Sequence, residues 1–82
     1  MKETFYILIG SMFWSKSKEE LVLSTEEATP YSGRWSVLQA AQAWKAPAHW
    51  SARDRALPVQ VFRKWREEGT EVLDLQGNVV LK

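Results

Sequence analysis

The chain has 82 residues, of which five are tryptophan and none is cysteine. A domain of this size buries only roughly 60 to 65% of the surface that its unfolded chain exposes, so its core is thin. Without cysteine there is no disulfide, and His49 as the only histidine excludes the common ligand sets of a structural zinc. Large aromatic side chains must therefore supply the stability that cross-links give to other small folds.

The amino-terminal segment does not resemble a targeting signal or a membrane anchor. Residues 5–9 are apolar, but Gly10 and Ser11 interrupt the run, and charged residues follow within 16–20. No stretch approaches the length that spans a bilayer. The sequence therefore predicts a cytoplasmic protein without a membrane partner.

The charges are distributed unevenly along the chain, although the net charge is only +1. Residues 1–27 and 67–82 are acidic overall, whereas residues 34–66 carry Asp54 as their only acidic side chain and are strongly basic. This asymmetry indicates either a basic face for an anionic partner or acidic and basic strands that pair within the fold. The second interpretation is slightly favoured, because paired strands place opposite charges across from each other at little cost.

The first third of the chain predicts an antiparallel hairpin. Residues 3–13 are rich in aromatic and β-branched side chains and predict a strand, with Gly10 as a bulge or bend. A polar turn at 15–18 and a second strand at 20–24 follow. Residues 26–33 contain Pro30 and Gly33 and predict a loop.

One helix is predicted over residues 37–45. Ser36, followed three residues later by Gln39, forms a capping-box pattern at its start, and Pro47 stops it. The face that is predicted to pack on the sheet carries residues at i, i+3, i+4 and i+7, namely Val37, Ala40, Ala41 and Trp44.

The remaining segments complete a small antiparallel sheet. Residues 47–57 predict a loop with a short turn capped by Ser51. Residues 58–68 have strand-forming side chains, whereas Pro58 and Gly69 are signals that flank a helix. A strand is the favoured interpretation. Residues 71–75 and 78–81 predict a hairpin. The expected fold is a single α+β domain over 1–82: ββαβ followed by a C-terminal β-hairpin, with one main helix packed on one face of the sheet.

The run GRWSVLQAAQAW, set after a hairpin and before a valine-rich strand, resembles small uncharacterised phage and prophage proteins of ββαβ type. In these proteins an aromatic residue precedes a capping serine or threonine and an alanine-containing helix follows, which here gives Trp35, Ser36, Ala40 and Ala41. The resemblance covers residues 4–65. It implies the fold and a viral or mobile-element origin, hence the host cytoplasm, and no activity.

A second resemblance concerns two separate segments. LSTEEA at 23–28 and FRKWREEG at 62–69, followed by the hairpin VLDLQGNVVL, are similar to parts of an excisionase-type winged helix. This resemblance implies a nucleic-acid-binding protein.

No residue set in the sequence matches a catalytic or cofactor motif. His49, Ser51 and Asp54 lie within six residues of one another, whereas a catalytic triad needs members that converge from separate elements around an oxyanion hole. The sequence has no glycine-rich phosphate loop and no clustered metal ligands. We therefore expect a non-enzymatic protein with no cofactor and no metal.

Two binding functions remain. The favoured one is a protein-binding accessory or inhibitor, with a protein partner or a second copy in a homodimer, because exposed tryptophan and arginine are enriched at interface hot spots. The alternative is nucleic-acid binding by the basic, tryptophan-containing segment 49–66, as in single-strand binders. The candidate residues, shared by both functions, are Trp50, Arg53, Arg55, Phe62, Arg63, Lys64, Trp65 and Arg66.

A strand over 58–66 places an aromatic side chain on each face of the sheet, Trp65 on one and Phe62 on the other. One helix covers only one of these faces. The other aromatic must be covered by the C-terminal hairpin, by a second subunit or by a partner, because an apolar patch is seldom left open. The sequence thus predicts a homodimer or a partner-binding face at this strand.

Overall fold

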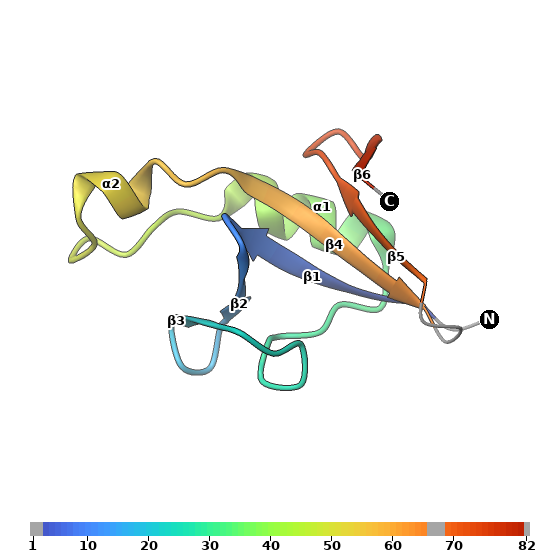
Figure 1. The fold of residues 1–82 in the computed structure, drawn as a ribbon, viewed down its shortest axis with the longest axis horizontal. Coiled ribbons are helices and arrows are strands. Elements are labelled where there is room, and N and C mark those ends of the chain that lie inside the picture. Colours follow the sequence, from blue (N-terminus) through green and yellow to red (C-terminus); the bar gives the residue numbers. More distant parts are fainter. Residues whose placement is uncertain (1–2, 66–68, 82) are drawn as a thin grey trace.

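The computed structural model describes residues 3–65 and 69–81 (Figure 1). In chain order its elements are β1 (Glu3–Ile9), β2 (Met12–Ser15), β3 (Glu20–Val22), α1 (Arg34–Ala43), α2 (Ala52–Arg55), β4 (Val59–Trp65), β5 (Thr70–Leu73) and β6 (Val79–Leu81). The strands form one antiparallel sheet in the order β3-β2-β1-β4-β5-β6, and α1 packs on one face of it. The predicted α+β fold with one main helix is confirmed.

The predicted strand over residues 3–13 is wrong, because the chain reverses direction at Gly10. The φ angle of Gly10 is 63°, a left-handed conformation that glycine adopts without steric cost. β1 and β2 form a tight hairpin in which Leu8 pairs with Phe13 and Ile9 pairs with Met12. β2 then pairs with β3, so this part of the chain supplies three strands where the sequence predicted two.

α1 begins at Arg34, earlier than the capping box predicts. Its N-cap is Gly33 in an extended conformation, and among the described residues no side chain caps it. Ser36 and Gln39 therefore lie inside the helix. The Nη2 atom of Arg34 donates to the backbone oxygen of Gly77 at 2.6 Å, which ties the start of α1 to the turn between β5 and β6. This long-range contact outweighs the local capping preference.

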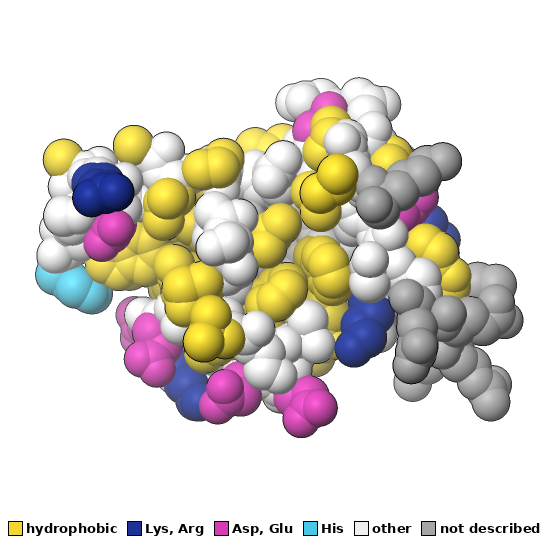
Figure 2. Space-filling model, in the orientation of Figure 1, with side chains coloured by type: hydrophobic (Ala, Val, Ile, Leu, Met, Phe, Trp, Pro, Cys, Tyr) yellow, Lys and Arg dark blue, Asp and Glu magenta, His cyan; other side chains and the backbone are white. Residues whose placement is uncertain are grey.

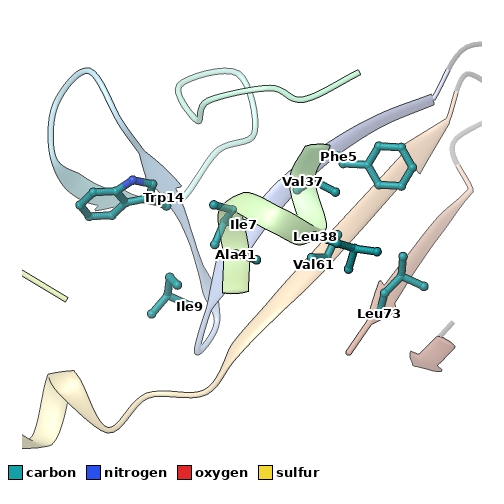
Figure 3. Close-up of a cluster of buried hydrophobic side chains, with 9 residues drawn as sticks. All are labelled: Phe5, Ile7, Ile9, Trp14, Val37, Leu38, Ala41, Val61 and Leu73. Atoms are coloured by element: carbon teal, nitrogen blue, oxygen red, sulfur yellow. The ribbon is translucent and has the colours of Figure 1, made fainter. Parts of the chain in front are cut away.

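The main core lies between α1 and the sheet (Figure 3). The predicted helix face is confirmed, because Val37 and Ala41 are buried and Ala40 and Trp44 pack partly buried against them, although Trp44 lies just beyond the end of α1. Leu38, which the pattern did not include, is also buried. The full buried set is Phe5, Ile7, Ile9, Trp14, Val37, Leu38, Ala41, Val61 and Leu73.

Three tryptophans extend this core toward the segment that carries α2. The rings of Trp14 and Trp44 meet edge to face with centroids 5.4 Å apart, and Trp50 lies 6.1 Å from Trp14 and 5.6 Å from Trp44. Such tilted and edge-to-face pairs add to the energy of simple burial. The cluster attaches the protruding segment after α1 to β2.

The carboxyl-terminal half agrees with the sequence prediction. Residues 59–65 form strand β4, while residues 66–68 of the predicted strand lie outside the described part of the chain. Ser51 caps the short helix α2 by accepting a hydrogen bond from the backbone N–H of Asp54 at 3.2 Å. β5 and β6 form the predicted hairpin, with Gly77 at a φ of 90° in its turn.

The segments that resemble a winged helix have other structures. Residues 23–28 form turns, and Phe62 to Trp65 lie in strand β4. The expectation of a winged helix is therefore wrong. The physical reason is the register between β1 and β4, which pairs Tyr6 with Phe62 and draws that segment into the centre of the sheet.

Asp74 gives the β5–β6 turn a dependence on pH. Its carboxylate accepts hydrogen bonds from the backbone N–H groups of Asn78 and Gln76, each at 2.9 Å. These bonds, that from Asn78 foremost, lower the pKa of Asp74 below its ordinary value. Because the pKa is lower in the folded state than in the unfolded state, the contribution to stability is present above the ordinary pKa and is lost as the pH falls through the folded pKa.

We therefore expect Asp74→Asn to weaken the acid dependence of stability. In urea denaturation monitored by circular dichroism, the midpoint of the parent protein should fall more steeply below about pH 4 than that of the variant. The other carboxylates are present in both proteins and contribute equally to the acid dependence of their stability. Superimposable acid profiles would show that the turn does not depend on the charge of Asp74.

Candidate binding surface

One face of the sheet points away from α1, and we call it the open face. Side chains alternate between the two faces along each strand, so Phe5, Ile7 and Val61 point toward α1 while Tyr6 and Phe62 point away from it. Figures 1 and 2 look onto the open face, with α1 behind the sheet, and hydrophobic side chains gather over β1, β4 and β5. This face is the candidate site.

A continuous apolar band crosses the open face. Each of the six strands contributes to it, and in sheet order its members are Val22, Phe13, Tyr6, Phe62, Val72 and Leu81. Leu8 of β1 lies on the same face, opposite Phe13. Phe13 and Phe62 meet edge to face with centroids 5.0 Å apart, and Tyr6 lies 6.0 Å from Phe13 and 6.4 Å from Phe62. The centre of the band is thus an aromatic triad on three adjacent strands.

The band is only partly covered. Ala28, from the loop after β3, packs against Tyr6 and Val22 and buries them. Phe13 and Phe62 remain half-buried, and Leu81 is 64% exposed. Part of the ring surface of Phe13, on β2, and of Phe62, on β4, is therefore left in contact with solvent, which is unfavourable for an isolated protein.

Few charged groups interrupt this face. Among the described strand residues on it, the charged side chains are Glu20, at the outer strand β3, and Lys64, near the end of β4. Both are exposed, and Thr4 and Thr70 flank Lys64 on the neighbouring strands. An apolar centre with a sparse polar rim is the usual anatomy of a protein interface.

Phe62 and Trp65 lie on opposite faces of the sheet, as the sequence predicted. Trp65 is on the side of α1, where Gly69 lies so close to its ring that a Cβ atom at position 69 would overlap it. Arg63 lies next to Trp65, with its guanidinium carbon 4.5 Å from the ring centroid. Of the predicted site residues that the structure describes, Phe62 and Lys64 are therefore the ones on the open face.

The charge of Arg63 is engaged within the fold. Its guanidinium forms ion pairs with Glu71, at 2.7 Å, and with Glu3, and the hydrogen bond to Glu71 is the main cause that raises the pKa of Arg63. This bears out, at Arg63, the interpretation that acidic and basic strands pair with each other. A phosphate group would have to displace both carboxylates to bind here.

The other predicted site residues lie elsewhere. Trp50 packs in the tryptophan cluster, while Arg53 and Arg55 are exposed on α2, where Arg55 donates to the backbone oxygen of Ala48 at 2.6 Å. Arg66 lies outside the described residues. The structure thus distributes the described candidates over the open face, the α1 side of the sheet and the α2 segment, and does not unite them in one surface.

Sequence reasoning missed the band members outside β4, namely Tyr6, Phe13, Val22, Val72 and Leu81. The alternation of residues 5–9 contained part of the signal, because both alternating sets there consist of apolar and aromatic side chains. The hairpin at Gly10 hid the rest, since Phe13 reaches the face of Tyr6 only when the chain reverses.

The residues considered for catalysis show no shared geometry. Ser51 serves as the helix cap for Asp54, and His49 is exposed. Over residues 3–65 and 69–81, no three potential metal-ligating side chains come together. Within the same ranges, no helix has the length and apolar character to cross a bilayer.

Comparison with protein-family models, with curated protein sequences and with solved structures finds no match for this chain.

Proposed function

We propose that this is a small non-enzymatic protein that acts by binding another protein, as an accessory or inhibitor, through the open face. The observation that carries the proposal is the apolar band, whose rings Phe13, on β2, and Phe62, on β4, stay partly exposed. Water-exposed aromatic rings at the centre of a sheet gain the most from a partner, because a partner removes their remaining apolar surface from water.

The composition of the face supports a protein partner. Aromatic residues are enriched at the energetic centre of protein interfaces, and charged residues are depleted there. The open face has three aromatic side chains at its centre, with Glu20 and Lys64 toward its rim. This distribution matches a protein-binding surface better than a surface for an anionic polymer.

The nucleic-acid alternative remains a prediction with less support. A single-strand binder combines cationic side chains with aromatic rings on one surface. Here Trp50 packs against Trp14 and Arg63 is paired with Glu3 and Glu71, while Arg55 lines a surface pocket with Trp44 and Lys45.

Site-specific photo-crosslinking in cells that produce the protein tests the proposal. Phe62 is replaced by p-benzoylphenylalanine, and the matched control carries the same group at Trp35, which is 74% exposed on α1. Because the reactive group at position 62 would lie inside the interface, we expect a discrete adduct after irradiation at 62 and none at 35. Mass spectrometry of the adduct then identifies its second component.

The outcomes separate cleanly. An adduct that forms at position 62 and contains a protein supports the proposal, whether that protein is foreign or a second copy. Equal labelling at positions 62 and 35, or none at 62, would show that the open face does not contact a protein in the cell.

A further inference from the structure

We infer that the surface pocket between the end of α1 and α2 binds a small organic anion with an apolar body, namely an aryl or alkyl carboxylate. The pocket has a volume of about 450 Å³, within the range of roughly 300 to 1,000 Å³ that small-molecule sites occupy. The residues that line it are Trp44, Lys45, Ala46, Ala48, Arg55 and Val59. The inference goes beyond the proposed function, and neither depends on the other.

The pocket lies on the side of the sheet that faces α1, away from the open face. Val59 pairs with Ile9 and is two residues before Val61, so its side chain points to the same side as these two buried residues. The segment after α1, helix α2 and the first residue of β4 meet there. Figure 1 shows that α2 extends beyond the end of the sheet, so the pocket occupies the junction between the α2 segment and the main body.

The walls of the pocket are held by contacts within the fold. The ring of Trp44 packs against Trp14 and Trp50, with centroids 5.4 and 5.6 Å away. The Nη2 atom of Arg55 donates to the backbone oxygen of Ala48 at 2.6 Å, which joins two of the lining residues. A ligand therefore has to order little of the chain when it binds, which lowers the entropic cost of binding.

The charges of the lining favour an anion. Its charged residues are Lys45 and Arg55, and within the described part of the chain neither forms an ion pair. Asp54 is the only acidic residue in 34–66, and it does not line the pocket. By contrast, the guanidinium of Arg63 is already engaged by two carboxylates. A guanidinium has five N–H donors in a planar fork that matches a carboxylate, and the fold uses one of those of Arg55.

The rest of the lining is apolar, and it favours an anion that carries an apolar group. Trp44 contributes an aromatic ring, and Val59 and two alanines contribute aliphatic surface. A small hydrated anion leaves this surface in contact with water, whereas an aryl or alkyl group covers it. Apolar walls with a few polar groups that fix the orientation of the ligand are the usual composition of a small-molecule site.

NMR titration of the purified full chain tests the inference with three probes. Phenylacetate has both the charge and the apolar body, phenethyl alcohol has only the apolar body, and acetate has only the charge. The readout is the indole N–H resonance of Trp44 in nitrogen–proton correlation spectra, identified by its absence from Trp44→Phe. This N–H is buried and has no acceptor among the described residues, so its chemical shift responds to changes around the ring.

We expect phenylacetate to shift the Trp44 resonance saturably, with a dissociation constant in the millimolar range because the probe is small and the pocket is open to solvent on one side. Phenethyl alcohol and acetate should each bind several-fold more weakly, since each lacks one of the two parts. The resonance of Trp35, an exposed residue of α1 outside the pocket, is the internal control and should not move.

Two charge-removing substitutions on α2 separate the pocket from the general charge of the protein. Arg55→Gln removes a cation of the lining, whereas Arg53→Gln removes the same charge from an exposed position on the same helix, outside the pocket. We expect Arg55→Gln to raise the dissociation constant of phenylacetate about three- to fivefold, the size of effect of an exposed ion pair. Arg53→Gln should leave it nearly unchanged, and phenethyl alcohol should respond to neither substitution.

Three results would overturn the inference: no saturable shift of Trp44 with phenylacetate up to tens of millimolar, equal affinities for phenylacetate and phenethyl alcohol, or equal weakening by Arg53→Gln and Arg55→Gln. Circular dichroism confirms that each variant is folded. These results are distinct from those of photo-crosslinking at Phe62, because that residue lies on the opposite side of the sheet from Val59.

Discussion

Replacing Trp14 by alanine is expected to lower the free energy of unfolding by about 3 to 5 kcal/mol, the usual range for a buried aromatic side chain. Trp14 is 9% exposed and belongs to the core between α1 and the sheet. It also contacts Trp44 and Trp50, so we expect its removal to leave a cavity and to weaken the packing of the segment that follows α1. Trp44→Ala should lower the free energy of unfolding by a smaller amount, because Trp44 is only partly buried.

Urea denaturation followed by far-ultraviolet circular dichroism measures this difference. Trp35→Ala provides the matched control, because the same side chain is removed from a site that is 74% exposed. We expect its midpoint to change little. Equal losses from Trp14→Ala and Trp35→Ala would mean that the tryptophan cluster does not form part of the core.

The second large effect concerns Arg63. Arg63→Met should lower the free energy of unfolding by about 2 kcal/mol, between the cost of breaking an exposed pair and that of breaking a fully buried one. The Arg63 side chain is 26% exposed, and its removal leaves Glu3 and Glu71 unpaired and near each other. The stacking of the guanidinium over Trp65 is lost as well.

Two comparisons make this prediction specific. Lys18→Met breaks the exposed ion pair with Glu27 and should change stability by less than about 0.5 kcal/mol. Adding Glu3→Gln and Glu71→Gln to Arg63→Met should restore part of the loss, because the uncompensated charges disappear. A triple variant that is less stable than Arg63→Met would show that carboxylate repulsion is not the cause.

Local sequence patterns predicted most of the elements but not their registers. The strand of Val59 to Trp65, the Ser51 cap and the Val37–Ala41 face depend on nearby residues, and all three are confirmed. The start of α1 was wrong because it depends on Arg34 reaching Gly77, a contact between residues distant in sequence.

The candidate site was predicted only at Phe62 and Lys64. The apolar band depends on five strand pairings that bring Val22, Tyr6 and Leu81 onto one face, and no short sequence pattern encodes such pairings. The engagement of Arg63 within the fold depends on distant residues in the same way. The partners of Arg63, Glu3 and Glu71, come from the two ends of the chain, which the sequence alone could not place beside it.

The pairing of β1 with β4 divides the domain into two halves that are each local in sequence. β1, β2 and β3 are consecutive antiparallel neighbours, as are β4, β5 and β6. Among the described strands, only the β1–β4 junction joins the two meanders, and it brings together residues as distant as Glu3 and Arg63, which are 60 positions apart. Forming this junction costs the conformational entropy of closing a long loop in a single step. Once it has formed, the two halves are fixed relative to each other. Cooperative folding of this protein thus depends on one long-range junction, and the apolar band on the open face is continuous only after that junction has formed.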